Sequence, residues 1–166
     1  MNQQEIWRGL WAITKEKQDA CKSEIEAVGK ARPTERGALQ LKAGIYNIAN
    51  AAIFSSGAEQ AMELMSKRFR NLIKYFPDLS AHYQGLPDEE KGIMETALYP
   101  EVFMRANFSD AYNQELDRAR EDGDPQAIFK ARIKKEILDD LLDLWRNFRL
   151  QNDLFTFAFE DKEDPS

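Results

Sequence analysis

The sequence predicts an all-α fold, a single-domain bundle of about five to six helices over residues 1–159 followed by a charged tail at 160–166. Three observations support this. Apolar residues recur three or four positions apart through most of the chain. Prolines and glycines fall between these periodic stretches. With 166 residues, 43% of them hydrophobic, the chain is long enough and apolar enough to bury one core.

The first two helices are predicted on either side of Pro33. Apolar side chains recur from Ile6 to Val28, so we expect a long amphipathic helix over residues 3–28. Thr34 can cap a second helix, which we expect to end at residues 55–57, where the sequence is Ser-Ser-Gly.

Prolines divide the middle of the chain. A third helix is expected from residue 58 to about 75, since Pro77 disfavours helical geometry at the residue before it. A short turn or helix follows over residues 78–85. Pro87 and the acids after it favour another helix start, with an expected end at residues 99–100. A further helix then runs to the turn at residues 121–125, with a break expected near 108–109.

The last helix begins at Pro125 and carries the longest apolar stripe, which extends to Phe148. Beyond it, Phe155, Phe157 and Phe159 alternate as in a strand. Because no other segment offers a partner strand, we interpret them as a frayed or docking helix end. We expect the tail at 160–166 to be mobile.

Composition excludes several classes of protein. The net charge of −6 argues against a strongly basic nucleic-acid-coating protein, although residues 1–82 hold 12 basic and 9 acidic side chains while 83–166 hold 11 and 20. Cys21 is the one cysteine, so no intramolecular disulfide can form. Without a leader-like or 18-residue apolar stretch, we expect a cytoplasmic protein with no membrane partner.

The sequence offers no catalytic constellation. His82 is the one histidine, which disfavours a zinc site and Ser-His-Asp or Cys-His catalysis. Glycine-rich phosphate loops are missing. Asp139, Asp140 and Asp143 are predicted to lie opposite the apolar stripe of their helix and to face water. We therefore expect no catalytic residues, no metal and no cofactor, and a carboxylate-metal enzyme ranks third among the hypotheses.

The stretch MSKRFRNLIKYF, residues 65–76, combines positive charges with rings. At about 100° per residue, its apolar side chains, Phe69 and Phe76 among them, form one arc and its cations the other, with Tyr75 beside them. The cations are Lys67, Arg68, Arg70 and Lys74. Two interpretations stay open: charges that complement the helix dipole and face water, or a ridge that contacts phosphates.

Two other sets of residues are candidate contacts. Arg146 and Arg149 flank the end of the last apolar stripe, where an arginine near Trp145 can also stack on a base. Four rings are candidates for a protein interface, and they are Trp7, Trp11, Phe155 and Phe157.

In its size, its helical architecture, its lack of catalytic residues and the stretches SKRFRNLIKYF and LWRNFRLQN, the chain resembles the small subunits of multi-subunit CRISPR interference (Cascade-like) complexes. The resemblance implies a non-enzymatic subunit in antiviral defence. Such a subunit packs against other protein subunits and holds the backbone of a target or displaced nucleic-acid strand, independently of sequence. The contacts would fall on Lys67, Arg68, Arg70 and Lys74, with Arg146 and Arg149 as second choices. The alternative is an adaptor or regulator that binds only protein, through its Trp and Phe surfaces.

Overall fold

The computed structural model describes residues 1–53 and 58–159, and it confirms a single all-α bundle, with no β-strand among these residues. The predictions for residues 55–57 and for the tail at 160–166 lie outside the described residues. The α-helices are α1 (Gln3–Val28), α2 (Pro33–Ile53), α3 (Ala58–Leu72), α4 (Pro77–Gln84), α5 (Asp88–Met104), α6 (Asp110–Asp122) and α7 (Pro125–Gln151).

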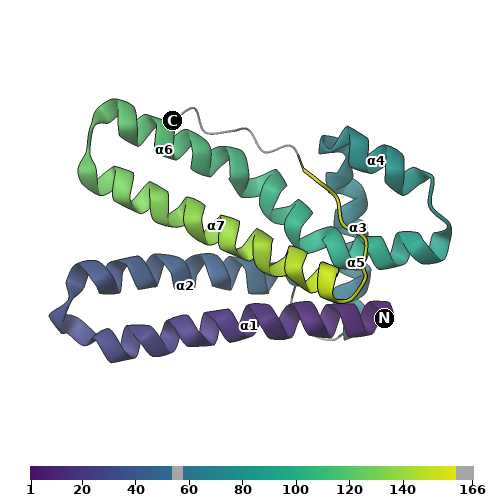
Figure 1. Cartoon of the computed structure of the whole chain (residues 1–166), viewed down its shortest axis with the longest axis horizontal. Helices are drawn as coiled ribbons and strands as arrows, with labels where there is room; N and C mark the ends of the chain where they lie inside the picture. The colour runs from purple at the N-terminus through teal and green to yellow at the C-terminus, as the bar shows by residue number, and fades with distance from the viewer. Residues whose placement is uncertain (54–57, 160–166) are drawn as a thin grey trace.

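Two long helical hairpins build the body of the molecule. α1 and α2 form one and α6 and α7 the other, and the two lie one above the other, while α3, α4 and α5 gather at one end (Figure 1). Local sequence sets the helix starts. Asn2 and Glu5 form a capping box at α1, and Asp124 caps α7 with Pro125 at its first turn.

α7 packs on both helices of the first hairpin, and its interactions with α1 include a buried hydrogen bond. The Trp145 indole Nε1 donates to Thr14 Oγ1 at 3.0 Å, and that hydroxyl donates to the Leu10 carbonyl at 2.7 Å. Trp145 is fully buried, so its N–H needs this partner. Close to it, the ring of Phe148 lies over Gly9, where no side chain separates the two helices.

α5 is the most deeply buried helix, since every residue from Met94 to Val102 is buried. This helix packs against α1, α2, α3 and α7. The predicted helix end at residues 99–100 is wrong, because α5 continues through Pro100. The proline lacks an N–H and so removes one backbone hydrogen bond, but packing on several sides holds the helix together.

The break expected near residues 108–109 is also wrong. Arg105–Ser109 forms a π-helical segment that continues α5 directly into α6. π-Helical segments are rare in proteins, and those that do occur often lie at functional sites.

The chain leaves α7 differently from the prediction. Residues 152–159 are not helical, so the helical interpretation of the rings is wrong, although the segment does dock. Asp153 has a φ of 53°, which turns the chain out of the helix, and the Leu154 N–H closes the turn on the Arg149 carbonyl at 2.9 Å. We call residues 152–159 the strap.

Two glycines provide a matched test of the α1–α7 approach. A Cβ at Gly9 would lie 2.5 Å from Cζ of Phe148, whereas a Cβ at Gly44, in α2, would meet nothing within 4 Å. We expect Gly9→Ala to lower the free energy of unfolding by about 1–3 kcal/mol through overpacking. Gly44→Ala should raise it by about 0.5–1 kcal/mol, because glycine disfavours helices. Urea unfolding measures both, and a neutral Gly9→Ala would contradict the packing.

Candidate nucleic-acid interface

The two faces predicted for residues 65–76 are confirmed. Met65, Phe69 and Ile73 are buried in the core. The cations on the opposite side are all exposed, and they are Lys67, Arg68, Arg70 and Lys74. We call these four residues the α3 basic face. The helical periodicity alone separates them from the rings.

Arg70 is held in place from behind by α5. Its Nη1 donates to Glu95 Oε2 at 3.1 Å, and the other carboxylate oxygen accepts from the Tyr83 hydroxyl at 3.0 Å. The Glu95 side chain is only 8% exposed while that of Arg70 is 54% exposed, so the pair reaches from the core to the surface. Burial, followed by the hydrogen bond to Glu95, raises the pKa of Tyr83 and keeps its hydroxyl protonated as a donor.

Two further contacts shape the α3 basic face. Arg68 Nη1 lies 3.5 Å from the hydroxyl of Tyr99, a fully buried residue whose pKa is raised by burial. At the end of the face, the Lys74 ammonium lies 5.2 Å from the ring centre of Tyr75. Tyr75 is 64% exposed, the most exposed of the large hydrophobic side chains in the described part of the chain.

Sequence reasoning missed Glu95 and Lys91. The Lys91 ammonium lies 5.5 Å from the ring centre of Tyr83, and it lines a small cleft with Arg70 and Glu95. Glu95 gave a usable signal, since it is a charged residue within the apolar run around Met94 and Ala97. Lys91 gave none, because its neighbourhood depends on how α3 packs on α5.

Arg149 is not a surface residue, and its assignment as a nucleic-acid contact is wrong. Its side chain is 0% exposed, and Nη2 donates to Glu101 Oε1 at 2.5 Å. The second oxygen of Glu101 accepts from Arg105 Nε at 2.7 Å. One buried carboxylate of α5 thus joins an arginine of the π-helical segment to an arginine of α7. Nε and Nη1 of Arg149 have no hydrogen-bond partner in the described structure.

Arg146 does lie at the surface of α7, a helix that is not among those packed against α3 in the described structure. The chain therefore brings the four cations of the α3 basic face together but leaves Arg146 apart from them.

The four rings proposed as a protein interface are mostly engaged within the chain. Trp7 is only 9% exposed, and its Nε1 donates to the Ile53 carbonyl at 2.9 Å, so this candidate for a protein interface lies in the core instead. Trp11 is half-buried and stacks on it, with ring centres 6.5 Å apart. Phe155 stacks on His82 with ring centres 4.6 Å apart, and Phe157 packs against Phe159 within the strap and remains half-buried.

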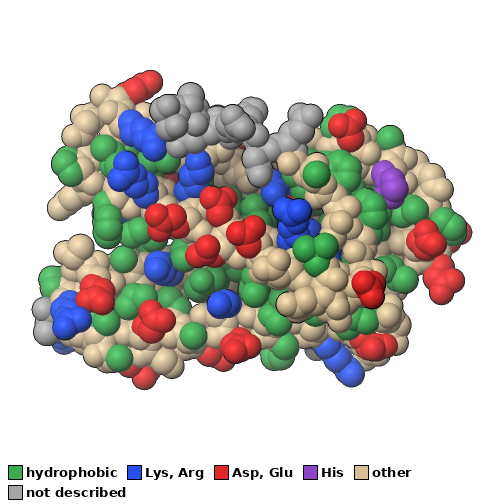
Figure 2. Space-filling model, viewed as in Figure 1, with side chains coloured by type: hydrophobic (Ala, Val, Ile, Leu, Met, Phe, Trp, Pro, Cys, Tyr) green, Lys and Arg blue, Asp and Glu red, His purple; other side chains and the backbone are tan. Residues whose placement is uncertain are grey.

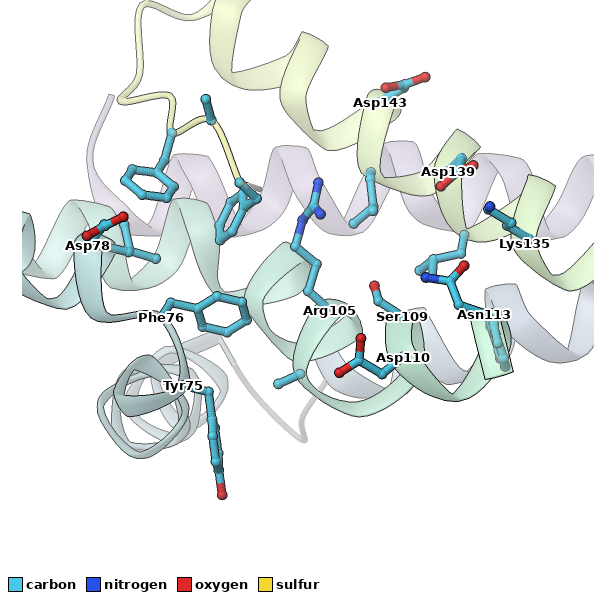
Figure 3. A pocket seen from close by; sticks show the side chains of 18 of the residues that line it. Tyr75, Phe76, Asp78, Arg105, Ser109, Asp110, Asn113, Lys135, Asp139 and Asp143 are labelled. Atoms are coloured by element: carbon cyan, nitrogen blue, oxygen red, sulfur yellow. The ribbon is translucent and has the colours of Figure 1, made fainter. Parts of the chain in front are cut away.

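A groove of about 850 Å³ opens where the connection from α3 to α4, the α5–α6 junction, α7 and the strap meet (Figure 3). Phe76, Phe157 and Phe159 are among its lining rings, and Arg105 projects into it. Acidic side chains gather over the middle of α7 (Figure 2), where the predicted exposure of Asp139, Asp140 and Asp143 is confirmed. Asp139 and Asp143 line the groove, and Asp140 does not.

Within residues 1–53 and 58–159, no three His, Cys, Asp or Glu side chains are placed to hold a metal ion together. None of the described helices combines the length and the apolar character needed to cross a membrane.

The chain matches no known protein-family model, and comparisons with curated proteins and with solved structures returned no similar protein.

The shared carboxylate of Glu101 yields a test of the buried network. Glu101→Gln removes the carboxylate that pairs with the fully buried guanidinium of Arg149, and we expect the free energy of unfolding to fall by about 3–5 kcal/mol. Arg149→Met should cost less, because Glu101 keeps Arg105 and two unpartnered buried donors are removed. Urea unfolding of both variants checks this order, and the reverse order would contradict the shared ion pair.

Proposed function

We propose that the chain is a non-enzymatic subunit of a larger assembly that holds the backbone of a single nucleic-acid strand on the α3 basic face, independently of sequence. The observation that carries the proposal is the exposure of four cations on one face of α3 and of the 3-10 turn Ile73–Tyr75 that continues it, with the exposed ring of Tyr75 at its end. A target or displaced strand, as in CRISPR interference complexes, is the kind of ligand such a surface fits.

Helical spacing supports backbone contact. Lys67, Arg70 and Lys74 follow one another at intervals of three and four residues, so their Cα atoms advance by about 5 to 10 Å along the axis at 1.5 Å per residue. A row of cations at this spacing can meet successive phosphates of an extended strand. Each neutralised phosphate adds affinity by releasing counterions.

The cations of the face have different roles. Lys67 and Lys74 contribute net charge, whereas the charge of Arg70 is offset by Glu95. Arg70 instead offers a guanidinium in a fixed orientation, because this planar group is held at one edge by the Glu95 carboxylate. A fixed guanidinium loses less side-chain entropy when it binds a phosphate.

Tyr75 adds a surface that phosphate contacts alone would not need. A base can stack on its ring, which lies beside Lys74, and stacking on aromatic side chains tolerates any base. Cations with an adjacent ring are typical of proteins that bind single strands without reading their sequence. A surface that only complements the helix dipole has no use for the ring.

The proposal is tested by the salt dependence of binding to a fluorescent single-stranded oligonucleotide. Each phosphate contact on a single strand contributes about −0.7 to the slope of log K against log salt. We expect Lys67→Gln with Lys74→Gln to reduce the magnitude of that slope by about 1.4. The matched control is Lys17→Gln with Lys22→Gln, two exposed lysines on α1, which should leave the slope unchanged.

Two results would contradict the proposal. One is the absence of binding at low salt. The other is an equal loss of slope in the α1 control, which would show that the overall charge of the chain matters and the α3 basic face does not.

A further inference from the structure

The small cleft where α3, α4 and α5 meet places cations of two helices side by side. Arg70 of α3 and Lys91 of α5 both line this cleft, whose volume is about 490 Å³. Because Arg70 also belongs to the α3 basic face, the cleft and the face share a residue. We propose that the cleft binds a phosphate group between Arg70 and Lys91. The inference rests on the proposed function, since it takes the phosphate to be one of the strand held on the α3 basic face.

Lys91 is a half-buried cation with unused hydrogen-bond donors. Its ammonium lies 5.5 Å from the ring centre of Tyr83, and it makes no hydrogen bond or ion pair with any of the described residues. The ring that supports it is fixed, because Tyr83 is buried and its hydroxyl donates to Glu95. An ammonium has three donors and no acceptor, so Lys91 can donate to the oxygens of a ligand.

The buried carboxylate at the back of the cleft is already occupied. One oxygen of Glu95 accepts from Nη1 of Arg70 and the other from the Tyr83 hydroxyl, so Glu95 does not pair with Lys91. Arg70 uses one of its five N–H donors in that bond and makes no other hydrogen bond within the described part of the chain. Its remaining donors form a planar array that suits the oxygens of a phosphate.

Asp88 is the group in the described lining that opposes an anion. Two cations and two carboxylates line the cleft, but Arg70 and Glu95 already form an ion pair with each other. Lys91 therefore attracts a bound phosphate while Asp88, an exposed residue that makes no described ion pair with Lys91, repels it. The two residues should have opposite effects on binding, which makes the site testable by the sign of each effect.

The volume agrees with a phosphate that is part of a nucleotide. About 490 Å³ lies within the usual range of about 300–1,000 Å³ for ligand sites. A strand that follows Lys67 and Arg70 along α3 reaches the cleft at Arg70, and Lys91 then adds a contact from a second helix.

The test uses the full chain and the fluorescent single-stranded oligonucleotide. We expect Lys91→Gln to reduce the magnitude of the salt slope by about 0.7, one phosphate contact on a single strand, while Lys22→Gln on α1 leaves it unchanged. Asp88→Asn should tighten binding roughly two- to fivefold at fixed low salt, as the removal of one exposed like charge predicts. Its matched control is Glu89→Gln, a neighbouring exposed acid that does not line the cleft and should leave affinity unchanged. Circular dichroism confirms that the variants fold.

Two results would overturn the inference and leave the proposed function standing. One is an unchanged slope in Lys91→Gln when the Lys67 and Lys74 variant loses slope. The other is an equal gain of affinity in Asp88→Asn and Glu89→Gln, which would indicate a response to net charge alone.

Inorganic phosphate separates the cleft from the strand. In an NMR titration of the isotope-labelled chain with inorganic phosphate at constant ionic strength, the side-chain signals of Lys91 should shift and saturate. If they do so while the oligonucleotide fails to bind, the proposed function is wrong and the cleft is a site for free phosphate. If neither ligand shifts the signals of Lys91, the inference is wrong.

Discussion

Burying a carboxylate removes its hydration, and α5 does so twice, at Glu95 and at Glu101. The cost of several kcal/mol per buried ion must be offset by close partners. Each carboxylate finds one in an arginine of another helix, Arg70 of α3 for Glu95 and Arg149 of α7 for Glu101. These two pairs join the central helix to its neighbours. The α3 basic face and the wall of the groove both depend on them.

The continuity of α5 also determines how the groove beside α7 and the strap is built. Arg105 reaches Glu101 because it lies four residues later on an unbroken helix, which runs through Pro100. From there its guanidinium meets the ring of Phe159 and so connects the core to the strap. The π-helical segment that begins at Arg105 then leads the chain into α6 on the far wall of the groove. A helix that ended at Pro100 would provide neither contact.

Local patterns in the sequence predict the parts of this structure that depend on nearby residues. Helical periodicity assigns Phe69 to the core and Lys67 to the surface, and both are confirmed, because the two sides of one helix follow from its own spacing. Ion pairs and hydrogen bonds between residues of different helices leave no such pattern in the sequence. Arg149 follows a tryptophan near the chain's end and has the pattern of a surface residue, yet its partner lies 48 positions away. The same holds for Trp7, whose partner carbonyl is that of Ile53.

We propose that a nucleic-acid strand binds on the α3 basic face, where Glu95 holds Arg70 in place. The most direct measurement is an NMR titration of the isotope-labelled chain with a single-stranded oligonucleotide, following backbone amides and the side-chain signals of Arg70. We predict that the shifts concentrate on residues 67–75 and on Lys91, the neighbour across the small cleft. Shifts centred on Arg146 and the end of α7, or no shifts at low salt, would show that the strand does not bind on the α3 basic face.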